Sequence, residues 1–199
     1  MSQSNAERLL ALADERGILR TREVEAEGIP RQSLSRLVDR GELVRIGRGL
    51  YQHPDHEVTA QHSLAVAAKR VPHGTVCLLS ALRFHDLTTQ NPLDVWLAID
   101  HKAREPTVDA VSLRIVRMSG EARTEGVQED EIEGVPVPIY EAAKTVADCF
   151  KYRSRVGLDV ALEALRDYHE KGGSIDTLWH YAEVCQVRTV IRPYMEAIV

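Results

Sequence analysis

The chain has 199 residues, of which 44% are hydrophobic and 28% are charged, and its formal net charge is −5. This composition is typical of a globular protein with one large core or two small ones. No apolar run approaches the roughly 20 residues needed to span a bilayer, and acids interrupt the N-terminal apolar positions. We therefore expect a cytoplasmic protein with no signal peptide and no membrane partner.

The first third of the chain predicts three helices and a β-hairpin. Apolar residues recur at helical spacing, Asn5 and Thr21 are candidate helix caps, and Gly17, Gly28 and Gly41 are candidate helix ends. Two β-prone runs then flank a Gly-Arg-Gly turn. The predicted elements are helices at 5–16, 21–28 and 30–41, an extended piece at 18–19, and strands at 43–46 and 50–52. This order predicts a winged helix-turn-helix domain over residues 1–54.

Positive charge is concentrated in this predicted domain. Residues 29–54 contain five arginines and two acids, a net charge of +3, whereas residues 55–199 contain sixteen Lys and Arg and twenty-two Asp and Glu, a net charge of −6. Screening restricts electrostatic fields to about 8 Å at cellular ionic strength, so local charge decides whether a polyanion binds.

The third predicted helix has a polar face opposite its apolar one. If Leu34, Leu37 and Val38 are buried, Arg, Gln and Ser side chains point outward, and these types hydrogen-bond to base edges and phosphates. Arg48, between two glycines, is placed at the tip of the wing. An alternative is that this helical domain mediates protein interactions. The predicted DNA-binding residues are Arg31, Gln32, Ser33, Ser35, Arg36, Arg40, Arg45, Arg48 and Tyr51.

The remainder of the chain predicts a connector and a second domain. Residues 55–74 form a polar linker with a helix at 59–71, and residues 75–199 form the second domain, with strands at about 94–138 and helices at about 139–198. Pro136 and Pro138 place the strand that contains them at a sheet edge. The predicted fold class is α+β: a winged helix-turn-helix followed by a mixed α/β domain with a small sheet and a C-terminal helical bundle.

Four blocks in this order resemble the AbiEi family of antitoxins. They are RIGRGLYQHP, TVCLLSALRFHDLT, PLDVWLAI and IYEAAKTVADCFKYR. The family's "SAL…HGL"-like block corresponds to Ser80-Ala81-Leu82 and His85-Asp86-Leu87, and its "T(L/V)xD" block to Thr145-Val146-Ala147-Asp148. Asp86 stands where the family usually has Gly, and residues 141–144 replace a "SPER"-like turn.

The resemblance implies a function and two partners. Members of this family are bacterial, neutralise a nucleotidyltransferase-like toxin of the AbiEii type, and repress their own operon by binding operator DNA through the winged helix. Antitoxin activity is attributed to the C-terminal domain, and some members bind paired inverted repeats. For this chain we expect a phage-defence antitoxin and repressor that is a monomer in solution or a weak dimer on DNA. A metabolite-responsive winged-helix regulator remains the alternative.

No pattern predicts an enzyme, a metal or a cofactor. Gly173-Ser174 with Asp176 lacks the paired carboxylates of a nucleotidyltransferase, and Asp94 and Asp100 lie about 20 Å apart on one predicted strand, too far to share a metal. Ser80 and Cys149 lack a nucleophile elbow. The spacing of His56, Glu57, His62 and His73 fits no zinc motif, and Cys77, Cys149 and Cys185 are widely separated, which predicts free thiols.

Overall fold

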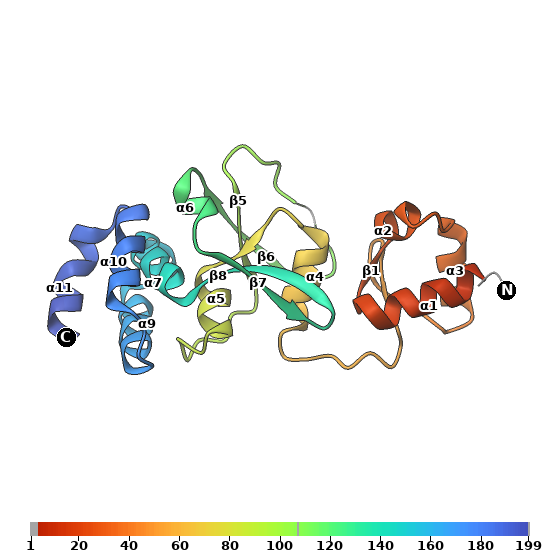
Figure 1. Cartoon of the computed structure of the whole chain (residues 1–199), viewed down its shortest axis with the longest axis horizontal. Helices are drawn as coiled ribbons and strands as arrows, with labels where there is room; N and C mark the ends of the chain where they lie inside the picture. The colour runs from red at the N-terminus through yellow and green to blue at the C-terminus, as the bar shows by residue number, and fades with distance from the viewer. Residues whose placement is uncertain (1–3, 107, 199) are drawn as a thin grey trace. The chain divides into compact units, whose positions relative to one another are not determined.

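The computed structural model describes residues 4–106 and 108–198 and has the predicted α+β fold (Figure 1). The chain divides into two compact units. The first unit comprises residues 1–72 together with two excursions from later in the chain, 106–112 and 131–137, and the second comprises 73–105, 113–130 and 138–199. The predicted boundary at residue 54 therefore falls inside the first unit.

The first unit contains the predicted winged helix-turn-helix. Its elements are α1 (Asn5–Arg16), β1 (Leu19–Arg20), α2 (Thr21–Ala26), α3 (Arg31–Asp39), β2 (Val44–Gly47) and β3 (Leu50–Gln52). The antiparallel strands lie in the order β1-β3-β2. Ser4, rather than the predicted Asn5, caps α1, because Ser4 and Glu7 form a capping box in which each side chain accepts the other's backbone N–H.

Residues beyond the predicted domain complete this unit. Helix α4 (His62–Arg70) starts later than predicted, and its Lys69 Nζ lies 3.0 Å from the carboxylate of Glu23 in α2. The turn at Glu133-Gly134 packs on the end of α1, so that a Cβ at Gly17 would lie only 1.8 Å from the Glu133 carbonyl oxygen. Sequence periodicity cannot reveal such contacts, because they join segments that are far apart in the chain, 46 residues apart for Glu23 and Lys69.

A second sheet has five strands in the order β6-β5-β4-β8-β7 (Figure 1). The strands are β4 (Thr75–Val76), β5 (Val95–Asp100), β6 (Leu113–Met118), β7 (Val127–Ile132) and β8 (Val135–Tyr140). The predicted edge position of the Pro136 and Pro138 strand is wrong, because β8 lies between β4 and β7. Since β4 has only two residues and pairs with β8 at Ile139, the prolines remove no bond to β4.

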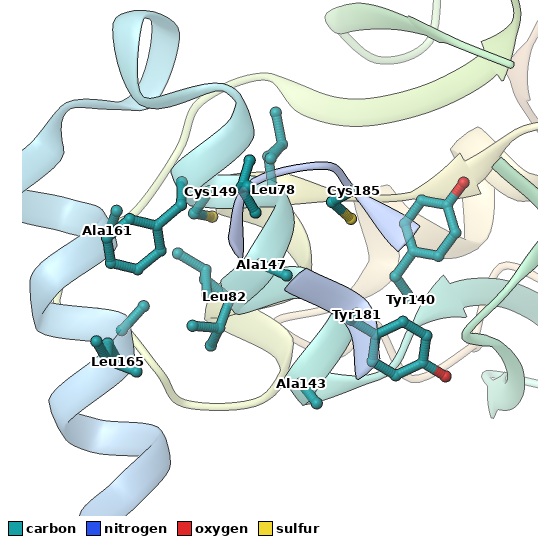
Figure 2. Packing of buried hydrophobic residues seen from close by; sticks show 14 of the residues in the cluster. Leu78, Leu82, Tyr140, Ala143, Ala147, Cys149, Ala161, Leu165, Tyr181 and Cys185 are labelled. Carbon is teal, nitrogen blue, oxygen red and sulfur yellow. The ribbon is translucent and has the colours of Figure 1, made fainter. Parts of the chain in front are cut away.

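Helices cover the core of the second unit. They are α5 (Leu78–Phe84), α6 (Glu121–Thr124), α7 (Ala142–Lys151), α8 (Arg153–Val156), α9 (Leu158–Glu170), α10 (Ile175–Val184) and α11 (Arg188–Ile198). Leu82 of α5, Ala147 of α7 and Leu165 of α9 share one apolar cluster with the sheet residues Trp96 and Val116 (Figure 2). Helix α7 is the central helix of this cluster, because nearly all of its residues are buried.

Candidate DNA-binding surface

Helix α3 has the two faces that the sequence predicts. Leu34 and Leu37 are fully buried in the core of the first unit. The opposite face is exposed to solvent. Its exposed polar residues are Arg31, Gln32, Ser35, Arg36, Asp39 and Arg40, and Ser33 is partly exposed. The helix therefore presents hydrogen-bond donors outward along its whole length, as a helix that enters a major groove must.

The charge on this face is mostly uncompensated. Arg40 pairs with Glu42 at 2.6 Å, but both side chains are exposed, so the pair contributes little to stability and can be exchanged for a phosphate. Among the described residues, Arg31 and Arg36 form no ion pair with a carboxylate. A guanidinium without a carboxylate partner can bind the phosphate backbone without first breaking an ion pair.

A pocket of about 300 Å³ lies between α3 and the start of α1. Ser33, Arg36 and Arg40 line one side of it, and Ser4, Asn5 and Ala6 line the other. The pocket combines two guanidinium groups, two hydroxyls and the positive end of a helix dipole. Its chemistry suits a backbone phosphate. The residues at the start of α1 were not among the predicted DNA-binding residues, because their proximity to α3 depends on the packing of the two helices.

The wing is anchored at its tip by residues from outside the predicted domain. Arg70 donates from Nη1 to the Arg48 carbonyl at 2.9 Å, and the Arg48 backbone N–H donates to Asp109 Oδ1 at 3.4 Å. Thr21, expected to cap α2, is instead its first residue and donates to the Gly49 carbonyl. These contacts use the backbone of the tip, so the Arg48 side chain stays exposed, and so does that of Arg45.

Tyr51 is the one predicted contact residue that the structure places elsewhere. It is only 7% exposed and belongs to the apolar cluster of the first unit. Tyr51 lies on β3, the central strand of the small sheet, where it pairs with Leu19 and Arg45. Its ring is therefore a core residue, and we remove it from the candidate surface.

The residues of the second unit on which the sequence resemblance was based make structural contacts in this chain. Ser80 Oγ accepts the Trp96 N–H at 2.9 Å, and both His85 Nε2 (2.8 Å) and Thr145 Oγ1 (3.1 Å) donate to the Tyr140 carbonyl. Asp148 is buried against Lys144 at 2.6 Å. These residues fix the strand β5, the end of β8 and the helix α7.

Asp86 adopts a backbone conformation that glycine adopts most easily. It follows α5 with a φ of +54°, in the left-handed region that glycine adopts most easily and that Asp tolerates better than most residues. The Leu87 N–H then donates to the Leu82 carbonyl at 2.8 Å, which closes the helix end. The departure from the family pattern at this position therefore preserves the turn.

The candidate catalytic residues are not assembled into a site. Asp94 precedes β5 and Asp100 ends it, while Ser174 caps α10 by accepting the Thr177 N–H. Burial raises the pKa of the Cys149 thiol, which disfavours the reactive thiolate. His56 and His62 do meet, but on the carboxylate of Glu133, and the described residues contain no group of three or more side chains suited to hold a metal.

The comparison with protein families bears on the surface just described. Residues 7–54 match the family model of the transcriptional regulator AbiEi antitoxin. The predicted AbiEi resemblance is thus confirmed over the winged helix, and the matched family is one of regulators and antitoxins rather than of enzymes. No curated protein matches the chain. No helix within the described residues has the length and hydrophobicity to cross a membrane.

Proposed function

We propose that this AbiEi-type regulator binds operator DNA through α3 and the wing, represses its own operon, and neutralises a nucleotidyltransferase-like toxin encoded beside it. The observation that carries the DNA-binding part is the outward polar face of α3, with Arg31 and Arg36 unpaired by carboxylates. The match to AbiEi regulators over residues 7–54 supports the same reading.

The proposed contacts fall into two kinds. Gln32 and Arg36 lie in the middle of the exposed α3 face and are assigned to base edges. Ser33 and Arg40 line the pocket beside α1, and Arg45 and Arg48 lie on the wing, so these are assigned to phosphates. Arg36 lines the same pocket, but its position in the middle of the exposed face is the reason that we assign its guanidinium to a base edge. Base contacts set the sequence preference, and phosphate contacts set most of the salt dependence.

Fluorescence anisotropy with a labelled duplex from upstream of the gene tests this assignment. Arg36→Ala is expected to weaken binding by about 1–3 kcal/mol and to reduce the preference over a scrambled duplex. Arg48→Ala is expected to weaken binding to both duplexes equally and to lower the slope of log affinity against log salt by about one.

Arg192→Ala provides the control. This arginine is exposed on α11 in the second unit, where it pairs with Glu196, so its loss removes the same formal charge away from the proposed DNA-binding surface. Equal losses of affinity for the Arg36→Ala and Arg192→Ala proteins would refute the assigned surface, because only the net charge would then matter.

A further inference from the structure

The second unit contains a pocket that the proposed DNA contacts do not use. It has a volume of about 420 Å³ and is lined by Trp96 of β5, Arg114 and Ile115 of β6, and Ser154 and Arg155 of α8. Sites for small ligands commonly measure about 300–1,000 Å³ and combine an apolar wall with a few polar groups. The lining has that composition, with two guanidiniums, one hydroxyl, and no carboxylate.

Both arginines of this pocket are held against aromatic rings. The guanidinium carbon of Arg114 lies 4.8 Å from the centre of the Trp96 ring, and that of Arg155 lies 5.7 Å from the centre of the Tyr152 ring. Stacking fixes the plane of a guanidinium and leaves its N–H groups free. Within the described residues, neither arginine forms an ion pair with a carboxylate. The pocket therefore presents two oriented donor groups with unused hydrogen bonds.

The net charge of the second unit favours a small anion over a long polyanion as the ligand of this pocket. Its three segments contain 14 Lys and Arg and 17 Asp and Glu, a net charge of 14 − 17 = −3. A long polyanion such as duplex DNA extends over many of these acids and is repelled by them. A small anion inside the pocket meets chiefly the two arginines, because salt screens the more distant acids within about 8 Å.

We propose that this pocket binds a phosphorylated small molecule, with its phosphate between Arg114, Arg155 and Ser154 and its organic part against Ile115. Planar guanidiniums match phosphate oxygens in a bidentate fashion, and a serine hydroxyl adds one more donor. Such a ligand would make the second unit a sensor as well as a toxin-binding body.

Isothermal titration calorimetry of the full chain at physiological salt, with pyrophosphate, ATP and a phosphate-free nucleoside as probes, tests the proposal. Binding of at least one phosphorylated probe and none of the nucleoside is expected. Arg114→Gln and Arg155→Gln should each weaken that binding about tenfold or more. Both side chains are exposed, so the variants are expected to fold, and far-UV circular dichroism checks this.

Arg166→Gln is the matched control, because Arg166 is an exposed arginine on α9 that does not line the pocket. A second readout uses fluorescence: in a Trp179→Phe background Trp96 is the sole tryptophan, and its emission should change on binding. The proposal is overturned if no phosphorylated probe binds at millimolar concentration, if all three Arg variants weaken binding equally, or if only a DNA duplex binds in an Arg114-dependent way.

Discussion

At the scale of single residues, Glu133 is constrained both in its backbone and in its carboxylate. Its φ of +53° is in the left-handed region, which costs a residue with a Cβ about 1–2 kcal/mol. Its carboxylate, only 2% exposed, accepts hydrogen bonds from Thr59, His56 and His62. Burial alone would raise the pKa of Glu133, but bonds from His62, Thr59 and His56 outweigh it and lower this pKa to about 2.

This lowered pKa predicts an acid-dependent loss of stability. The charged form of Glu133 is favoured in the fold, so its contribution is present above the unfolded pKa of about 4.5 and disappears as the pH falls toward 2. Glu133→Gln should lower the free energy of unfolding at pH 6 by an amount on the order of 3 kcal/mol. Urea denaturation should show this difference shrinking between about pH 4.5 and pH 2.

Glu131→Gln is the control for this experiment, since Glu131 is exposed on the same strand β7. It should change stability little at any pH. If the loss of unfolding free energy in Glu133→Gln stayed constant from pH 6 to pH 2.5, the shape of the Glu133 side chain rather than its charge would stabilise the turn.

At the scale of elements, the β7–β8 turn and the end of α1 form an interlocked pair. Glu133 and Gly134 both have positive φ, as a tight two-residue hairpin turn requires. A Cβ on Gly134 would lie 3.0 Å from the Arg16 carbonyl carbon and 3.0 Å from the Glu15 carbonyl oxygen. Backbone meets backbone at this contact, so neither side can yield by rotating a side chain.

Two glycine-to-alanine variants separate packing from backbone strain. Gly28 has a φ of +73° and Gly134 a φ of +74°, but a Cβ at Gly28 meets nothing within 4 Å. Gly28→Ala should therefore cost about 1–2 kcal/mol from strain alone, and Gly134→Ala about 1–3 kcal/mol more from overpacking. Hydrogen exchange of α3 amides measures both losses. Equal losses would contradict the packing of the turn on α1.

The sequence predicted features that depend on local spacing better than features that depend on contacts between distant segments. The burial of Leu34 and Leu37 and the exposure of Arg36 follow from helical spacing, which is a local property of α3. The burial of Tyr51 depends on β1 pairing with the far side of β3, and the anchoring of Arg48 depends on Asp109, 61 residues away. Propensity carries no information about such partners, so the sequence could not separate a core tyrosine from an exposed one.

At the scale of the whole molecule, each unit has its own apolar core, and the proposed tasks divide between them. The α3 face and the wing lie in the first unit, whereas the second unit has its own apolar core and a net charge of −3. Negative charge would speed the capture of a toxin with a basic, nucleotide-handling surface. Deleting residues 1–54 would test this division poorly, because Glu23 pairs with Lys69 and Gly17 packs on Glu133, so the deletion would also expose parts of the remaining chain.

Point variants of the DNA surface test the division without removing those contacts. The Arg36→Ala and Arg48→Ala double variant should lose repression of a reporter driven by the upstream DNA, because it lacks two of the exposed guanidiniums assigned to DNA. It should still fold, because the Arg48 backbone still bonds to Asp109 and Arg70. In the same cells it should still rescue growth when the gene of the proposed toxin is induced. Arg192→Ala should retain both activities. If the double variant fails to rescue growth while circular dichroism shows it folded, then toxin neutralisation requires the α3 face, and the tasks are not separable.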